Sequence, residues 1–431
     1  MKRQVPPVVT AIVLIIVLGA VLGLYTRGLL GTEQGEGGEM GGAPEPPEAP
    51  PPPVGLSTVH VTTFAGYTRP GYADGNGWEA EFNGPSGIAL APDGSLYVAD
   101  SRNHRLRRVT ADGTTTTVAG SGPVDCLPGG FADGPAHQAR LFNPTGLAVA
   151  ADGTVYFADS GNHRIRALKD GVVTTVAGGP TEADELGMEE GGYRDGPADS
   201  ALFRFPSDVA LTRSGDILVS DLGNAAVRRI AQDGTVTTVA QFGGLGNPVS
   251  LVALDGQVEP LIVADAEAAA LFGIGSAGRL SPRRFTGVVA KRPTAVCALP
   301  GGRLAVADAE WHTIHGVEPS GRSVLLAGIL PPGPHGNHAD GTGADARFAA
   351  PCALVAAGNV LYVADFGNNC IRALTLPAVW AEPPPPGRSP RERWRRTRQG
   401  DQRRTEGDGV AYRGEGPYQD LRGRRAGAEA H

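Results

Sequence analysis

The chain repeats one stretch of sequence closely enough to fix its fold class before any single residue is considered. Residues 87–105 read GIALAPDGSLYVADSRNHR, and residues 146–164 read GLAVAADGTVYFADSGNHR. The Asp that ends the second apolar run recurs six times, at intervals of 43 to 62 residues. These positions are Asp100, Asp159, Asp221, Asp265, Asp308 and Asp365. A repeat of this length indicates neighbouring copies of one structural unit.

Each copy is predicted to hold four short strands separated by turns. A first apolar run follows a Pro, and an Asp- and Gly-rich turn such as Asp93-Gly94 leads to a second run rich in β-formers. A polar corner, a third run and a Thr- and Val-rich fourth run complete the unit. Four-stranded antiparallel units at this spacing are typical of β-propeller blades. The sequence therefore predicts an all-β, six-bladed β-propeller over residues 55–380.

The two ends of this span complement each other. The sixth copy stops at Pro377 without a fourth run, and a run of that kind opens the span at Val61–Gly66. We expect this N-terminal strand to complete the last blade, beside the run that contains Leu374. Such pairing would close the ring and remove the exposed edges of an open array.

The polar corners carry a resemblance to a known family. Residues 100–106 (DSRNHRL), 159–165 (DSGNHRI) and 365–371 (DFGNNCI) resemble the NHL repeat. The corners after Asp265 and Asp308 depart from it, so those two blades are predicted from spacing and strand pattern. The resemblance implies an NHL-type propeller. It also implies an enzymatic alternative, because NHL-like propellers include a metal-dependent lyase and related six-bladed propellers include calcium-containing hydrolases.

The segments around the propeller have a different composition. Residues 8–25 are almost wholly apolar and follow Lys2 and Arg3, which predicts a transmembrane signal anchor with residues 1–7 in the cytosol. A cleaved signal peptide, which would leave a secreted protein, is the alternative. Either way the propeller is expected outside the cytosol. Residues 26–54 are a Gly-, Glu- and Pro-rich linker, and residues 381–431 are an Arg- and Pro-rich tail predicted to be disordered.

Charge and cysteine content limit the classes of partner and site. Residues 55–380 hold 23 basic and 32 acidic residues, a net charge of −9, which argues against nucleic-acid binding. Candidates for a local basic patch are Arg107, Arg108, Arg228 and Arg229. No CxxC spacing indicates a zinc or redox motif among the cysteines, which are Cys126, Cys297, Cys352 and Cys370.

The predicted binding surface is the face where the corners open. The links from one blade to the next open on the same face, and four of them are long: residues 66–82, 120–142, 178–203 and 328–348. Each contains Asp-Gly and ends in Phe, whose expected role is to pack between blades. Two neighbouring blades have short links, which predicts an uneven rim. The candidate binding residues are Arg102, Asn103, His104, Arg105, Asn162, His163, Arg164 and Asn368.

The recurring Asp residues have a structural interpretation, because an Asp at a strand end accepts backbone N–H bonds and pairs with a nearby Arg. His104 and His163 are expected to be partly exposed. We therefore expect a non-catalytic binding module for a protein, peptide or glycan partner, with no cofactor. The alternative is a metal-dependent lyase or hydrolase whose site lies at the mouth of the central channel, with Ca²⁺ or Zn²⁺ as its cofactor.

Overall fold

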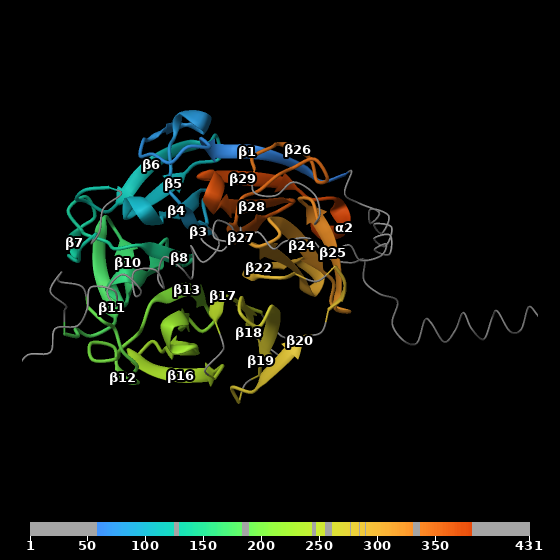
Figure 1. Ribbon diagram of the computed structural model, residues 1–431. Helices are drawn as coiled ribbons and strands as arrows, with labels where there is room; N and C mark the ends of the chain where they lie inside the picture. Colours follow the sequence, from blue (N-terminus) through green and yellow to red (C-terminus); the bar gives the residue numbers. More distant parts are fainter. Residues whose placement is uncertain are drawn as a thin grey trace, which may run out of the picture. The chain divides into compact units, whose positions relative to one another are not determined.

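The computed structural model describes residues 58–124, 129–182, 189–243, 247–254, 261–275, 277–283, 285–288, 290–330 and 337–381. These residues form six β-sheets, of which five have five strands and one has four. The sheets are arranged as blades around a central axis, as the ring in Figure 1 shows. The prediction of an all-β, six-bladed propeller is therefore confirmed.

Blades 1 to 3 share one architecture, in which four antiparallel strands run from the centre outward and a two-residue strand adds to the outer edge. Blade 1 holds β3 (Pro85–Leu90), β4 (Leu96–Asp100), β5 (Arg105–Val109), β6 (Thr114–Ala119) and β2 (Gly75–Asn76). Blade 2 holds β8 (Pro144–Val149), β9 (Val155–Asp159), β10 (Arg164–Lys169), β11 (Val172–Ala177) and β7 (Gly134–Pro135). Blade 3 holds β13 (Pro206–Leu211), β14 (Ile217–Asp221), β15 (Ala226–Ile230), β16 (Thr235–Gln241) and β12 (Gly196–Pro197).

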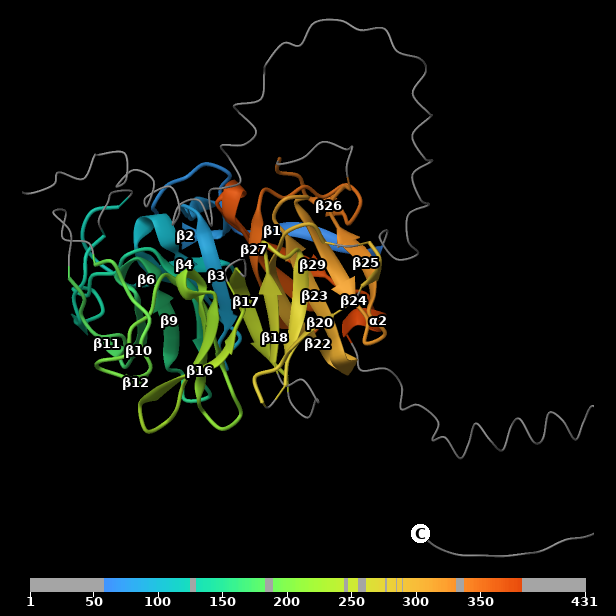
Figure 2. The ribbon, with the colours of Figure 1, turned by 60° about the horizontal axis from the view of Figure 1, so that its bottom comes forward.

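Blades 4 and 5 depart from this pattern at their outer edges. Blade 4 is the four-stranded sheet, with β17 (Pro248–Ala253), β18 (Leu261–Asp265), β19 (Ala270–Ile274) and β20 (Leu280–Arg283). Blade 5 holds β22 (Pro293–Leu299), β23 (Arg303–Asp308), β24 (Thr313–Val317), β25 (Arg322–Ala327) and β21 (Thr286–Gly287), and β21 pairs parallel to β25. The turned view of Figure 2 brings β17 and β18 of blade 4 to the front.

The N-terminal strand closes the ring, as expected. Blade 6 holds β27 (Pro351–Ala357), β28 (Val360–Asp365), β29 (Cys370–Thr375), β1 (His60–Gly66) and β26 (Gly341–Thr342). Strand β1 lies between β29 and β26, with Val61 opposite Leu374. Strands from the two ends of the propeller thus share one sheet, and this pairing covers the outer edge of β29.

Short 3₁₀ turns and one α-helix complete the described secondary structure. The turns are η2 (Gly77–Glu79), η3 (Ser101–Asn103), η4 (Ser160–Asn162), η5 (Leu222–Asn224), η6 (Pro300–Gly302) and η7 (Phe366–Asn368), and the helix is α2 (Ala378–Ala381). Within the described ranges, no helix combines the length and apolarity needed to cross a membrane. The predicted anchor (8–25), the linker (26–54) and residues 382–431 of the tail lie outside those ranges.

The hydrophobic core lies between neighbouring blades. Phe82, Phe203 and Phe348, which end three of the long links, are at most 1% exposed. Phe82 packs in one cluster with Ile88 and Leu96 of blade 1 and with residues of blade 6. Burial of each such ring stabilises the fold by roughly 1.5–3 kcal/mol. The links are therefore part of the packed scaffold as well as surface loops.

Candidate functional site

A buried arginine organises the corner of four blades. Arg107 lies on β5 and donates from Nη1 to Asp100 at the corner, at 2.8 Å, and from Nη2 to Asp74 in the link, at 2.7 Å. It also donates to the carbonyl oxygens of Ala73 and Glu81. One side chain thus binds the corner and the link together. The same arrangement recurs in blades 2, 3 and 6 with Asp133–Arg166–Asp159, Asp195–Arg228–Asp221 and Asp340–Arg372–Asp365.

The electrostatics of these clusters follow from burial. Removal from water raises the pKa of Asp100 to about 6, although Arg107, Asn103 and the N–H of Asn83 all favour its ionised form. The link carboxylate of Asp74 is less buried, and its pKa lies below the usual value because Thr117 and Arg107 bind it. Both carboxylates are therefore ionised at neutral pH, which keeps the guanidinium paired.

Blades 4 and 5 have neither the arginine nor the Asp-Gly link. Phe272 and His315 occupy the position of Arg107, opposite the middle of the second strand. Asp265 and Asp308 are instead held by backbone N–H groups of their corners and short links. His315 is fully buried, and desolvation lowers its pKa to about 4, so it is neutral there. A neutral residue thus replaces the cation in the two blades that lack its second carboxylate.

The last residue of the corner joins four of the six blades to the next blade. It has left-handed backbone geometry in all six blades, with φ between 49° and 57°. Where it is His or Asn, its side chain accepts an N–H from the residue that leads into the next inner strand. The pairs are His104 Nδ1–Asn143 (3.1 Å), His163 Nδ1–Phe205 (3.0 Å), His312 Nδ1–Ala350 (2.9 Å) and Asn369 Oδ1–Gly84 (3.0 Å). Ala225 and Ala269 hold this position in blades 3 and 4.

We call the boundary between two neighbouring blades a seam. At the two seams that lack a corner His or Asn, side chains of the inner strands form the hydrogen bond instead. Asp208 of blade 3 accepts the N–H of Leu251 in blade 4 at Oδ2, at 3.0 Å. Ser250 of blade 4 accepts the N–H of Val296 in blade 5 at Oγ, at 3.3 Å. At these seams the inter-blade hydrogen bond lies at the channel wall.

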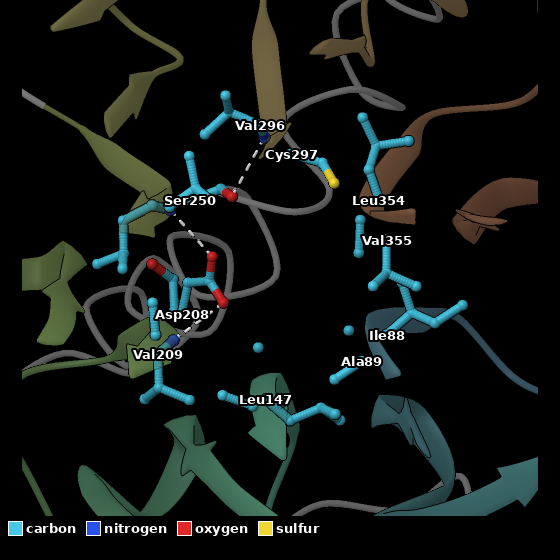
Figure 3. Close-up of a pocket in the computed structure, with 18 of the residues that line it drawn as sticks. Ile88, Ala89, Leu147, Asp208, Val209, Ser250, Val296, Cys297, Leu354 and Val355 are labelled. Carbon is cyan, nitrogen blue, oxygen red and sulfur yellow. Dashed lines mark hydrogen bonds between the residues drawn. The ribbon is translucent and has the colours of Figure 1, made fainter. Parts of the chain in front are cut away.

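The central channel is lined by the inner strands of all six blades and encloses about 330 Å³. Its wall is mostly aliphatic, and Figure 3 shows Asp208 in this wall between Val209 and Ser250. Asp208 is the one charged residue among the described residues that line the channel. Burial raises its pKa to about 6, against the effect of hydrogen bonds from Leu251, Ser250 and its neighbour Val209.

The structure places the eight predicted binding residues at the corners and buries seven of them. Those seven, with exposed fractions between 1% and 8%, are Asn103, His104, Arg105, Asn162, His163, Arg164 and Asn368. The expectation that His104 and His163 are partly exposed is wrong, because each packs beneath the following link. Arg102 is half-buried, with its guanidinium 4.8 Å from the ring centre of Phe366 in blade 6.

The candidate basic patch is not formed as expected, because Arg107 and Arg228 are fully buried in the ion pairs described above. Cys297, Cys352 and Cys370 are free thiols, and Cys126 lies outside the described residues. Within the described part of the chain, no three His, Cys, Asp or Glu side chains gather as a metal-binding group. The enzymatic alternative stays a prediction, which metal analysis of purified protein tests.

Comparison with known families matches the corners. A family model described as the NHL repeat matches residues 82–108, and one described as the teneurin NHL domain matches residues 104–169. The propeller therefore contains NHL repeats. The chain is 29% identical over 337 residues to NHL repeat-containing protein 2 of Bos taurus, an alignment covering 72% of this chain and 41% of that protein.

Two further comparisons place the NHL propeller among related chains. It is 28% identical over 177 residues to teneurin-4 of Homo sapiens, covering 38% of this chain and 6% of that protein. The chain spans less than half the length of these curated relatives. A solved structure of a Bacteroides thetaiotaomicron protein of unknown function superposes with a TM-score of 0.56 at 16% identity, covering 74% of this chain and 76% of that one. That likeness shows the fold alone.

Sequence reasoning missed a row of exposed aromatic rings on the NHL propeller. Tyr72, Phe131 and Tyr193 stand two residues before the link Asp of blades 1, 2 and 3, and are 40%, 44% and 47% exposed. The ring centres lie 4.9–5.1 Å from the guanidinium carbons of the buried arginines beneath. We call these three residues the aromatic arc. Their fixed offset from the Asp-Gly of each link is the signal that could have identified them.

Proposed function

We propose that this propeller is a non-catalytic binding module for a protein partner, and that its contact surface is the loop face bearing the aromatic arc. The observation that carries the proposal is the repetition of an exposed aromatic ring at one position on three consecutive blades. Aromatic residues are enriched in protein interfaces and supply many of their binding hot spots. Scattered exposed apolar residues need no explanation, but a row in register does.

The rigidity of the arc supports this role. Each ring stacks on an arginine that is fixed by two carboxylates and two carbonyl oxygens. The hydroxyl groups of Tyr72 and Tyr193 bond to Thr117 and Thr238 of the outer strands, at 3.0 and 2.8 Å. Rings held in this way lose little freedom on binding, so more of their contact energy appears as affinity.

We propose that the partner is met outside the cytosol, with the chain anchored through residues 8–25. The support is the apolar segment preceded by Lys2 and Arg3, and the Pro-rich linker that follows. The acidic balance of the propeller, 23 basic against 32 acidic residues, favours a neutral or basic protein surface over nucleic acid. Sequencing of the mature N-terminus tests the anchor, since a start after about residue 25 would mean that the segment is cleaved.

The binding proposal is tested with the full chain and two variants. In the triple variant Y72A/F131A/Y193A the arc is removed. In W78A a more exposed ring is removed, because Trp78 is 75% exposed and follows Gly77, which bonds to the turn between β5 and β6 away from the corners. Proteins enriched on the wild-type chain are identified by quantitative mass spectrometry, and each candidate is then measured as a purified pair by calorimetry.

The proposal expects at least one purified partner whose affinity falls tenfold or more in the triple variant and is unchanged in W78A. Equal binding to all three chains would refute the loop face as the contact surface. Glycan and peptide arrays run beside these measurements. If no protein partner is found but a glycan or peptide binds in a way that depends on the arc, that ligand class would be the partner instead of a protein.

A further inference from the structure

Asp208 departs from the pattern of the channel wall. The third residue of each inner strand, counted from its Pro, is small or apolar in the other blades, and only blade 3 places a charge there. The six residues are Gly87, Gly146, Asp208, Ser250, Ala295 and Ala353. A Cβ on Gly146 of blade 2 would lie 2.1 Å from Asp208 Oδ1, so the neighbouring glycine provides the space for the carboxylate.

Among the described residues that line the channel, none has a basic side chain that could pair with this carboxylate. It accepts the N–H groups of Val209 at 2.9 Å and Leu251 at 3.0 Å, and a bond from Ser250. A carboxylate has about four acceptor sites, so capacity remains on the half-buried side that faces the channel. A charge left without a partner in an apolar wall is costly.

The bond across the seam does not by itself require a charge. At the next seam Ser250 accepts the N–H of Val296 with a neutral hydroxyl at 3.3 Å. An amide oxygen at position 208 would keep the acceptor for the Leu251 N–H, although the second oxygen, which accepts from Val209, would be lost. The hydrogen bond between blades 3 and 4 therefore does not account for the negative charge of Asp208.

The rest of the wall has the chemistry of a small-molecule site. One aliphatic side chain from each blade follows the residues named above, in the order Ile88, Leu147, Val209, Leu251, Val296 and Leu354. The enclosed volume of about 330 Å³ lies at the lower end of the roughly 300–1,000 Å³ typical of ligand pockets. A wall of mainly aliphatic residues with one fixed charge, Asp208, and a few serine hydroxyls fits the usual form of such sites.

We propose that the central channel binds a small organic cation, with its primary or secondary ammonium group on the Asp208 carboxylate and its apolar body against the aliphatic wall. The ammonium supplies the missing countercharge and donates to the free carboxylate acceptor sites. The site is separate from the aromatic arc and does not depend on the protein-binding proposal.

The proposal includes a pH dependence. Besides Asp208, the titratable residues lining the channel are Cys297, whose pKa burial raises to about 11, and Cys352, whose pKa burial also raises. On the neighbouring strand β14, Asp221 is paired with Arg228. Asp208 is thus the group that changes charge in the channel near pH 6, and ammonium binding weakens as pH falls below that value.

The test uses the full chain and three named probes: benzylamine, its neutral analogue benzyl alcohol, and Ca²⁺. Wild-type protein at pH 7.5 is expected to bind benzylamine at least tenfold more tightly than benzyl alcohol, by calorimetry or ligand-detected NMR. Asp208→Asn keeps an acceptor for Leu251 and is expected to abolish this preference. Ser207→Ala, on the same strand, removes a hydroxyl that bonds to the carbonyl oxygen of Pro248 and is expected to retain the preference.

Three results would overturn the proposal. The first is equal binding of benzylamine to wild-type and D208N protein, and the second is no saturable binding of benzylamine up to millimolar concentration. The third is Ca²⁺ binding that D208N abolishes without any binding of the amine, which would make the site inorganic. Asp208→Ser, which copies the neighbouring blade, replaces D208N if thermal unfolding shows that the amide variant is not folded.

Discussion

Arg107 and Asp100 form a fully buried ion pair, with 2.8 Å between Nη1 and Oδ2, and the same guanidinium binds Asp74 in the link at 2.7 Å. The arginine is present in the four blades that have a link Asp and absent from the two that do not. Because a buried charge is tolerated only when it is paired, the corner, the third strand and the link depend on one another. This dependence explains why the Asp-Gly of the link recurs together with the NHL corner.

Replacement of Arg107 by Met is expected to lower the free energy of unfolding by about 3–5 kcal/mol, because Asp100 would stay buried without its partner. Urea denaturation of the full chain measures the change. The neighbouring Arg108 is the matched control, since it pairs with Asp93 at the surface and its loss is expected to cost at most about 1 kcal/mol. Similar losses in R107M and R108M would contradict the proposed importance of the buried pair.

Phe131→Tyr is expected to stabilise the protein. The hydroxyls of Tyr72 and Tyr193 each bond to a Thr of the outer strand, whereas Thr175 in blade 2 has a buried Oγ1 without a hydrogen-bond partner. A tyrosine at position 131 would supply that partner, for a gain of about 0.5–1.5 kcal/mol. Thermal and urea unfolding measure the gain, and Tyr72→Phe should show a loss of similar size. If F131Y is neutral or lowers the stability, a tyrosine in blade 2 does not form the bond to Thr that Tyr72 and Tyr193 form in blades 1 and 3.

Asp208 makes the stability of wild-type protein depend on pH in a direction opposite to that of Asp74, whose pKa is lowered on folding. The pKa of Asp208 is raised from 3.8 to about 6 on folding, so the folded state binds more protons than the unfolded state between those values. Stability is therefore expected to fall as pH rises from about 4 to 6, and then to level off. Subtracting the unfolding free energy of D208N at each pH isolates this contribution. A flat difference would show that Asp208 is ionised without penalty.

Much of the fold follows from the sequence because the repeat is strong. Spacing of the corner Asp gives the blades, and the missing fourth run at the C-terminal end identifies the closing strand, as the pairing of Val61 with Leu374 confirms. The corner residues, however, do not show in the sequence which side chains are exposed. His104 looks like a surface residue in the sequence, yet it is 2% exposed because the following link packs over it.

The channel could not be predicted from one sequence in the same way. Asp208 stands out only after the six inner strands are superposed in register, because a single Asp after Pro-Ser is otherwise typical of a turn. Likewise, the arginines on the third strands were candidates for surface charge, since nothing local shows that link carbonyls and carboxylates enclose Arg107. Both the channel wall and the burial of Arg107 depend on contacts between segments that are distant in sequence.

His163 tests whether the corner residue holds neighbouring blades together. Its Nδ1 accepts the N–H of Phe205 in blade 3, and its Nε2 lies 2.8 Å from the Glu189 carbonyl oxygen, which identifies Nε2 as the protonated nitrogen. His163→Ala leaves the Phe205 N–H without a partner and is expected to cost about 1–3 kcal/mol. His163→Asn is expected to recover part of that loss, because Asn369 makes the equivalent bond to Gly84 at the closing seam and Asn tolerates left-handed geometry.

The two variants are also expected to differ from wild type in how their stability depends on pH below 6.5. Desolvation lowers the pKa of His163 to about 4 from 6.5, so the unfolded state binds more protons between those values. This residue's contribution is complete above about pH 6.5 and is lost as pH falls toward 4. Relative to H163N, wild-type protein should lose stability over that range, measured by urea unfolding at fixed pH. If H163A and H163N lose the same unfolding free energy, and neither differs from wild type in its pH dependence, His163 only fills space at the corner.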